Sequence, residues 1–99
     1  MITIYKTLDG KLNEQSAFEE GTWVHLTAPS DSEIQQVTSF FNVGEDQLKA
    51  ALDEEERARI ETEEGFTLFL VDVPLKEKEE GASIFTTLPL GIILSGENI

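Results

Sequence analysis

The chain has 99 residues, of which 39% are apolar, so it is long enough for a single domain with one modest core. Its 20 Asp and Glu residues outnumber 7 Lys and Arg residues, which gives a net charge of −13. That charge excludes direct binding to nucleic acid, which requires clustered Lys and Arg, and favours cations or basic partners instead.

The chain contains no cysteine, which excludes disulfides, thiolate metal sites and cysteine nucleophiles. No stretch has the 18 to 20 or so consecutive apolar residues that a membrane helix needs. The N-terminus, Met1 to Lys6, lacks the layout of a signal peptide. We therefore expect a soluble chain that lies in the cytosol or on the cytosolic side of a membrane.

The N-terminal third reads as three strands. Residues 3–8 alternate and are rich in β-branched side chains, and Asp9-Gly10 is a turn signal before a short returning strand over residues 11–14. Residues 23–27 predict a third strand, with Trp23, His25 and Thr27 on one face.

Two helices follow. Ser30 and Glu33 have the spacing of a capping box, so a helix is expected to begin there. Apolar residues recur at helical spacing up to Phe41, and residues 42–44 provide a stop. A second short helix is expected over residues 45–52.

The C-terminal part reads as further strands. Residues 58–63 and 66–73 predict a hairpin around Glu64-Gly65, and the second of these strands is apolar enough to be central in a sheet. Pro74 is expected to end that strand, because proline cannot donate to a ladder. We further expect a charged loop over residues 75–81. Two strands should follow it, over residues 83–88 and 91–94, with Pro89 between them.

The order of elements is therefore strands, two helices and strands. This order predicts an α+β fold (α/β layered), with a mixed sheet of about six strands and the helices packed on it. After a turn over residues 95–98, Ile99 looks like the first apolar residue of another strand. We therefore expect residues 1–99 to be one soluble domain, and a fragment of a longer protein.

No catalytic constellation is evident. His25 is the single histidine, and its position within a strand favours a structural role. The chain has no G-x-S-x-G elbow and no glycine-rich loop after a strand. We predict that the protein is not an enzyme and has no catalytic or cofactor-binding residues.

Acidic residues gather in three runs. Such runs are ordinarily solvated surface, and none has the spacing of an EF-hand loop, although carboxylate oxygens do attract Mg²⁺ and Ca²⁺. Diffuse attraction of divalent cations is therefore expected rather than one tight site. The runs are Asp53 to Glu56; Glu61, Glu63 and Glu64; and Glu77, Glu79 and Glu80.

From Thr22 to Ile99 the chain resembles the N-terminal cytoplasmic domain of CorA-type magnesium transporters. The resemblance rests on the order and spacing of several blocks along most of the chain. These are Thr22-Trp23-Val24-His25-Leu26, the helix through Ile34, Val37 and Phe40-Phe41-Asn42-Val43, the short helix from Leu48 to Leu52, Arg57-Ala58-Arg59-Ile60-Glu61, Phe66 to Leu75, and Leu90 to Ile99.

The resemblance implies a mixed sheet sandwiched by helices. It also implies a parent that is a homopentameric Mg²⁺ channel, with a long stalk helix, two membrane helices and a Gly-Met-Asn selectivity motif. These 99 residues contain none of the stalk, the pore or that motif. The domain would then lie on the cytoplasmic side of the cell membrane and contact other copies of itself, whereas the isolated domain is expected to be monomeric.

The sequence departs from the pattern of this family at one place that concerns metal binding. Many members of the family carry Leu-Glu-Asp in the second short helix, and those acids help to hold a regulatory Mg²⁺ between subunits. The matching stretch here reads Leu48-Lys49-Ala50, so that site does not carry over. Asp53 and Glu54 lie about one turn later and are the candidate metal ligands.

Two hypotheses of function remain open. In the first, the chain is a regulatory or sensing domain of a CorA-like transporter of Mg²⁺ or another divalent cation, with Mg²⁺ as a weak regulatory ligand and no tightly bound cofactor. In the second, it is a free-standing acidic module that binds a basic protein surface and has no role in transport.

Overall fold

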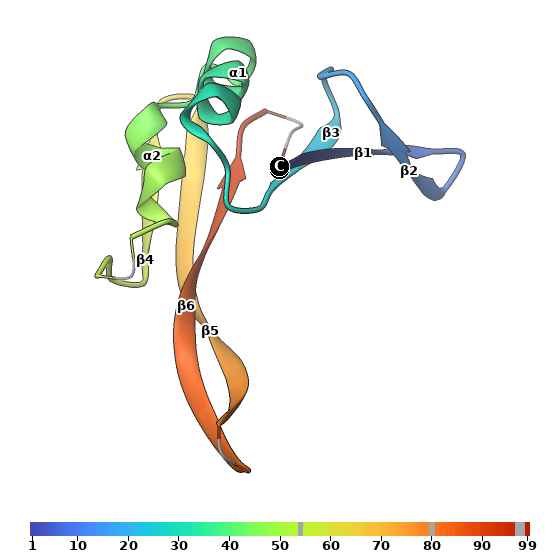
Figure 1. Cartoon of the computed structure of the whole chain (residues 1–99). Helices are drawn as coiled ribbons and strands as arrows, with labels where there is room; N and C mark the ends of the chain where they lie inside the picture. Colours follow the sequence, from blue (N-terminus) through green and yellow to red (C-terminus); the bar gives the residue numbers. More distant parts are fainter. Residues whose placement is uncertain (54, 80, 97–98) are drawn as a thin grey trace.

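The computed structural model describes residues 1–53, 55–79, 81–96 and 99, with the backbone alone for residues 77–79 and 82–85. Its elements follow the expected order of strands, two helices and strands, with three described strands before the helices and three after them (Figure 1). The prediction of an α+β fold with about six strands is therefore confirmed. The described strands nevertheless form two three-stranded sheets, rather than the single mixed sheet that was expected.

The first sheet contains the predicted N-terminal hairpin. Strands β1 (Ile2–Leu8) and β2 (Lys11–Gln15) are antiparallel and meet at Asp9 and Gly10, whose φ angles of 52° and 76° are left-handed. Strand β3 (Thr22–Leu26) pairs with the other edge of β1, so the order is β2-β1-β3. A two-residue turn with positive φ at both positions matches the twist of the strands that it joins.

Helix α1 (Asp31–Phe41) begins and ends where the sequence predicts. Ser30 and Glu33 form both hydrogen bonds of the capping box, and Asn42 ends the helix with a left-handed φ of 53°. Helix α2 (Glu45–Ala50) is shorter than the expected 45–52, because the chain enters a turn at residue 51.

The second sheet is built on two long strands. Strand β4 (Arg59–Glu63) pairs with the start of β5 (Phe66–Glu79), and β6 (Ala82–Leu94) pairs with β5 along its whole length. Beyond the end of β4, β5 and β6 continue as a two-stranded ribbon that extends away from the helices (Figure 1).

This ribbon corrects three predictions. Pro74 does not end its strand, residues 75–81 are mostly strand rather than a loop, and Pro89 lies within the single strand β6. Pro74 pairs with Thr87, and Pro89 pairs with Asp72. Because these pairs lie two positions apart, they are of the same hydrogen-bonding type, and proline fits a pair whose nitrogens point away from the partner.

The two faces of the second sheet differ in burial. Leu68 and Leu70 point to one face and are 0% and 2% exposed, and they belong to the core together with Ile34 and Val37 of α1. The opposite face, called the outer face below, carries large apolar side chains that are exposed. Its members are Ile60, Val71, Leu75, Leu88, Leu90, Ile92 and Leu94.

The turn after α2 lies directly on the buried face of this sheet. A Cβ atom added to Gly91 of β6 would meet the Cβ of Ala51 at 2.7 Å. Since real Cβ atoms do not approach so closely, the absence of a side chain at Gly91 sets how near the turn can come to the sheet.

Candidate functional site

Asp53 lies in the turn between α2 and β4. Its backbone carbonyl accepts the N–H of Glu56 at 3.2 Å, and its Oδ1 accepts the N–H of Glu55 at 2.9 Å. One carboxylate oxygen of Asp53 therefore helps to hold the turn. The second candidate, Glu54, lies outside the described residues, as does Glu80 of the third acidic run.

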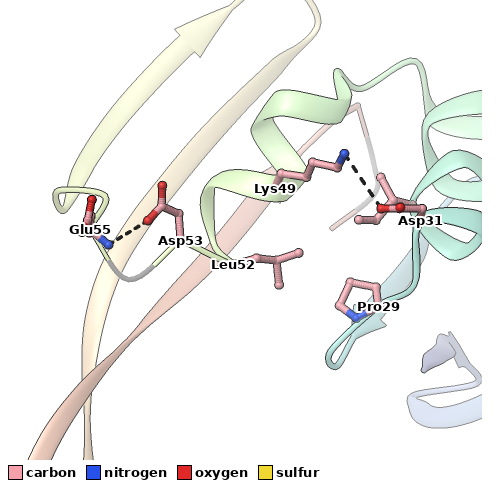
Figure 2. A pocket seen from close by; sticks show the side chains of 7 residues that line it. Pro29, Asp31, Lys49, Leu52, Asp53 and Glu55 are labelled. Carbon is pink, nitrogen blue, oxygen red and sulfur yellow. Dashed lines mark hydrogen bonds and ion pairs between the residues drawn. The ribbon is translucent and has the colours of Figure 1, made fainter.

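Asp53 borders an open hollow of about 610 Å³ between the start of α1 and the end of α2. Figure 2 shows Asp53 and Glu55 on one side of this hollow and Asp31 on the other, with Leu52 between them. The carboxylates are thus distributed around the hollow and do not converge on one point. The hollow is lined by Pro29, Asp31, Ile34, Lys49, Leu52, Asp53 and Glu55.

One of the residues that line the hollow, Lys49, carries a positive charge. Lys49 Nζ lies 2.6 Å from Glu45 Oε1 and 3.9 Å from Asp31 Oδ1. The hydrogen bond to Glu45 is the main cause that raises the pKa of Lys49 above its usual value. The i, i+4 spacing of Glu45 and Lys49 signals this pair in the sequence, whereas Asp31 is brought in by packing.

Arg59 engages two of the acidic runs. Its Nη1 lies 2.6 Å from Glu56 Oε2, and its Nε lies 2.6 Å from Glu61 Oε1. The two hydrogen bonds, the one to Glu61 first, raise the pKa of Arg59 above its usual value. Arg59 and Glu61 share one face of β4 by their spacing, but sequence inspection did not single out this cluster.

In the part of the chain that the structure describes, no three or more His, Cys, Asp or Glu side chains are grouped to hold a metal ion. The single histidine, His25, is exposed on β3. Mg²⁺ is ordinarily bound by one or two carboxylates and several waters. The role of Asp53 and Glu54 as metal ligands stays a prediction.

Among the described residues, no helix is both long enough and apolar enough to cross a membrane.

The known proteins that this chain resembles are CorA transport proteins. The cobalt/magnesium transport protein CorA of Methanocaldococcus jannaschii is 32% identical over 89 residues, which are 88% of this chain and 26% of that protein. The complete structure of the CorA magnesium transporter from M. jannaschii matches 99% of this chain with a TM-score of 0.78 and 25% identity. The soluble domain of the same transporter gives a TM-score of 0.78 at 22% identity.

The chain spans only part of these relatives, 30% of the complete transporter structure and 38% of the soluble-domain structure. The family model described as CorA-like Mg²⁺ transporter protein matches residues 18–99, which include both helices and all strands from β3 onward. The chain therefore belongs to the CorA-like Mg²⁺ transporter family.

Proposed function

We propose that this chain is the cytoplasmic regulatory domain of a homopentameric CorA-like transporter of Mg²⁺ or another divalent cation, and that residues 1–99 are part of a longer chain. The observation that carries the proposal is the fold. Almost the whole chain, 99% of it, superposes on the CorA soluble domain with a TM-score of 0.78. The match of the family model over residues 18–99 supports the same assignment.

The proposed mechanism is electrostatic. A net charge of −13 on each copy makes neighbouring copies repel one another when they are held together in an assembly. Mg²⁺ that screens or bridges facing carboxylates lowers this repulsion and favours a closed arrangement. When cytosolic Mg²⁺ falls, the repulsion returns and the subunits move apart, so binding and conformation are coupled.

Asp53 is the proposed ligand from this chain, together with Glu54. Lys49 lies beside Asp31 and Glu45, so both of those carboxylates already have a positive charge next to them. Asp53 lies on the far side of the hollow from Asp31 (Figure 2). Since Asp53 offers one oxygen beyond its turn, the remaining ligands of a bridging Mg²⁺ would come from water and a carboxylate of the neighbouring copy.

The test is Mg²⁺ binding by the purified full-length protein, measured by calorimetric titration. Asp53→Ala is expected to lower the number of Mg²⁺ ions bound or their affinity. Asp72→Ala removes the same charge from an exposed position on β5 and serves as the matched control. Equal binding by both variants would remove Asp53 from the proposal.

Regulation is tested separately by chelating Mg²⁺ and measuring distances between spin labels on the cytoplasmic domains. Chelation is expected to increase those distances, and an unchanged packing of subunits would refute the electrostatic mechanism. The alternative, an acidic module that binds a basic protein, predicts instead a partner that is released steeply as salt rises.

A further inference from the structure

Lys49 lies between carboxylates that come from two different helices. Its Nζ is 2.6 Å from Oε1 of Glu45 and 3.9 Å from Oδ1 of Asp31. Glu45 is the first residue of α2, which also carries Lys49, and Asp31 is the first residue of α1. One ammonium group therefore neutralises acids from the first turns of both helices.

The position of Lys49 follows from the packing of the two helices. Glu45 and Lys49 are four residues apart on α2, so their side chains are neighbours on one face of the helix. Ala50, the next residue, is buried, and so is Ile34 in the first turn of α1. These buried contacts set the orientation of both helices, and the ion pairs of Lys49 lie at their exposed ends.

Without the lysine, Glu45 and Asp31 would be suitable ligands for a hard cation. Mg²⁺ is ordinarily bound by one or two carboxylates together with several waters. The side chains of Asp31 and Glu45 are 87% and 48% exposed, so a hydrated ion can reach both. Two carboxylates that share one cationic nitrogen are close enough together to share a hydrated metal ion instead.

The ammonium group of Lys49 supplies the positive charge at this place. The hydrogen bond to Glu45 is the first cause that raises the pKa of Lys49, with smaller contributions from the charges of Asp31 and Asp46. Because an ordinary lysine already has a pKa of about 10.4, Lys49 is charged at physiological pH. A divalent cation about 4 Å from this charge is repelled even through water.

The other side of the hollow has a different electrostatic environment. Asp53 and Glu55 line the same hollow as Lys49. Among the residues that the structure describes, no ion pair involves either of these two carboxylates. Figure 2 shows the ion pair of Lys49 with Asp31 on one side and the two carboxylates on the other. One side is therefore neutralised by a lysine, and the other side is not.

We propose that Lys49 acts as a covalently attached cation that excludes Mg²⁺ and other divalent cations from Asp31 and Glu45. It thereby confines divalent-cation binding at this hollow to the side of Asp53, and this second part rests on the proposed function. Lys49 is a residue that determines where cations bind and is not itself a ligand.

The experiment counts Mn²⁺ ions bound to the purified full-length protein, from the electron paramagnetic resonance signal of the free ion. Mn²⁺ is the probe because it takes the same carboxylate and water ligands as Mg²⁺. Lys49→Met removes the charge and keeps a long side chain that favours helix. We expect this variant to bind one more Mn²⁺ per chain than the wild type, whereas Lys49→Arg, which keeps the charge, should bind the same number.

Lys6→Met is the matched control, because Lys6 forms its ion pair with a single carboxylate, that of Glu19. It should bind Mn²⁺ as the wild type does. No additional ion in Lys49→Met, or the same additional ion in Lys6→Met, would overturn the proposal. Adding Asp31→Asn to Lys49→Met should abolish the additional ion, and its persistence would also overturn the proposal.

Asp31→Asn alone provides a test that does not depend on any change at Lys49. Since Asp31 is not a ligand while Lys49 is present, this variant should bind as many Mn²⁺ ions as the wild type, and a loss would overturn the proposal. Asp53 is unchanged in all of these variants. Failure of the proposed function would appear in Asp53→Ala, whereas failure of this inference would appear in the comparison of Lys49→Met with the wild type.

Discussion

Glu33 connects three parts of the chain at the start of α1. Its Oε1 accepts the backbone N–H of Ser30 at 2.9 Å and lies 3.1 Å from the N-terminal amino group, while its own N–H donates to Ser30 Oγ at 3.2 Å. The bond from the Ser30 backbone is the main cause that lowers the pKa of Glu33 below its usual value. The charged form of Glu33 is therefore favoured in the folded chain.

This lowered pKa gives stability a pH dependence with a definite sign. A carboxyl whose pKa falls on folding adds stability above its unfolded pKa of about 4.3, and that stability is lost as pH falls through the folded pKa. Glu33→Gln keeps an acceptor for the Ser30 N–H but removes the charge. We expect the variant to be less stable at pH 7 and to lose less stability on acidification, as measured by urea unfolding between pH 7 and pH 3.

Glu14→Gln on the exposed strand β2 is the control for this measurement. If Glu33→Gln and the wild type lost stability in parallel as the pH fell, the charge of Glu33 would play no part in holding the start of α1.

At the scale of elements, β5 shows how one strand serves two environments. Leu70 is 2% exposed on the face that the turn after α2 covers, whereas its neighbour Val71 is 41% exposed on the outer face. The alternation of side chains along a strand separates these neighbours. The same backbone thus contributes to the core on one side and to an apolar surface on the other.

Truncation of these two neighbours should have very different costs in the 99-residue chain. Leu70→Ala leaves a cavity among close-packed atoms and is expected to lower the free energy of unfolding by about 2–5 kcal/mol. Val71→Ala removes atoms that are already in contact with water and should cost well under half of that. Denaturant unfolding of both variants measures the difference, and similar losses would show that the outer face is also packed.

At the scale of the whole molecule, charge and apolar surface oppose each other. The net charge of −13 keeps copies apart, while the outer face offers them an apolar surface on which to associate. The range of the repulsion depends on salt, because the Debye length falls from about 30 Å at 0.01 M to about 3 Å at 1 M.

We therefore expect the 99-residue chain to be monomeric at low salt and to self-associate as salt is raised, which sedimentation velocity measures. Leu90→Glu places a charge within the outer face and should suppress the association. A sedimentation coefficient that is independent of salt, or an equal response of the Leu90→Glu variant, would contradict this account.

Features of the fold that depend on residues close together in the sequence were predicted, whereas features that depend on which strand lies alongside were not. The Asp9-Gly10 turn, the capping box at Ser30 and the stop at Asn42 depend on neighbouring residues, and all three were predicted correctly. Pro74 and Pro89 were misjudged, because a proline is excluded from a strand only where its nitrogen must donate. That condition depends on which strand lies beside it, and the sequence does not contain this information locally.

The contacts of the candidate site also fall into those that the local sequence predicts and those that depend on packing. The pairing of Lys49 with Glu45 follows from helical spacing, but the approach of Asp31 depends on how two helices pack. Asp53 was identified from a resemblance and from its charge. The hydrogen bond that commits one of its oxygens to the turn became visible only in three dimensions.

The contact between Gly91 and Ala51 has a consequence for how this sequence can diverge. A larger side chain at either position would push the turn after α2 off the sheet, since a Cβ at Gly91 would lie 2.7 Å from that of Ala51. A substitution at one position is therefore tolerated only if the other residue is small enough to make room. The two positions, forty residues apart in the chain, therefore each limit the side chains that the other can carry.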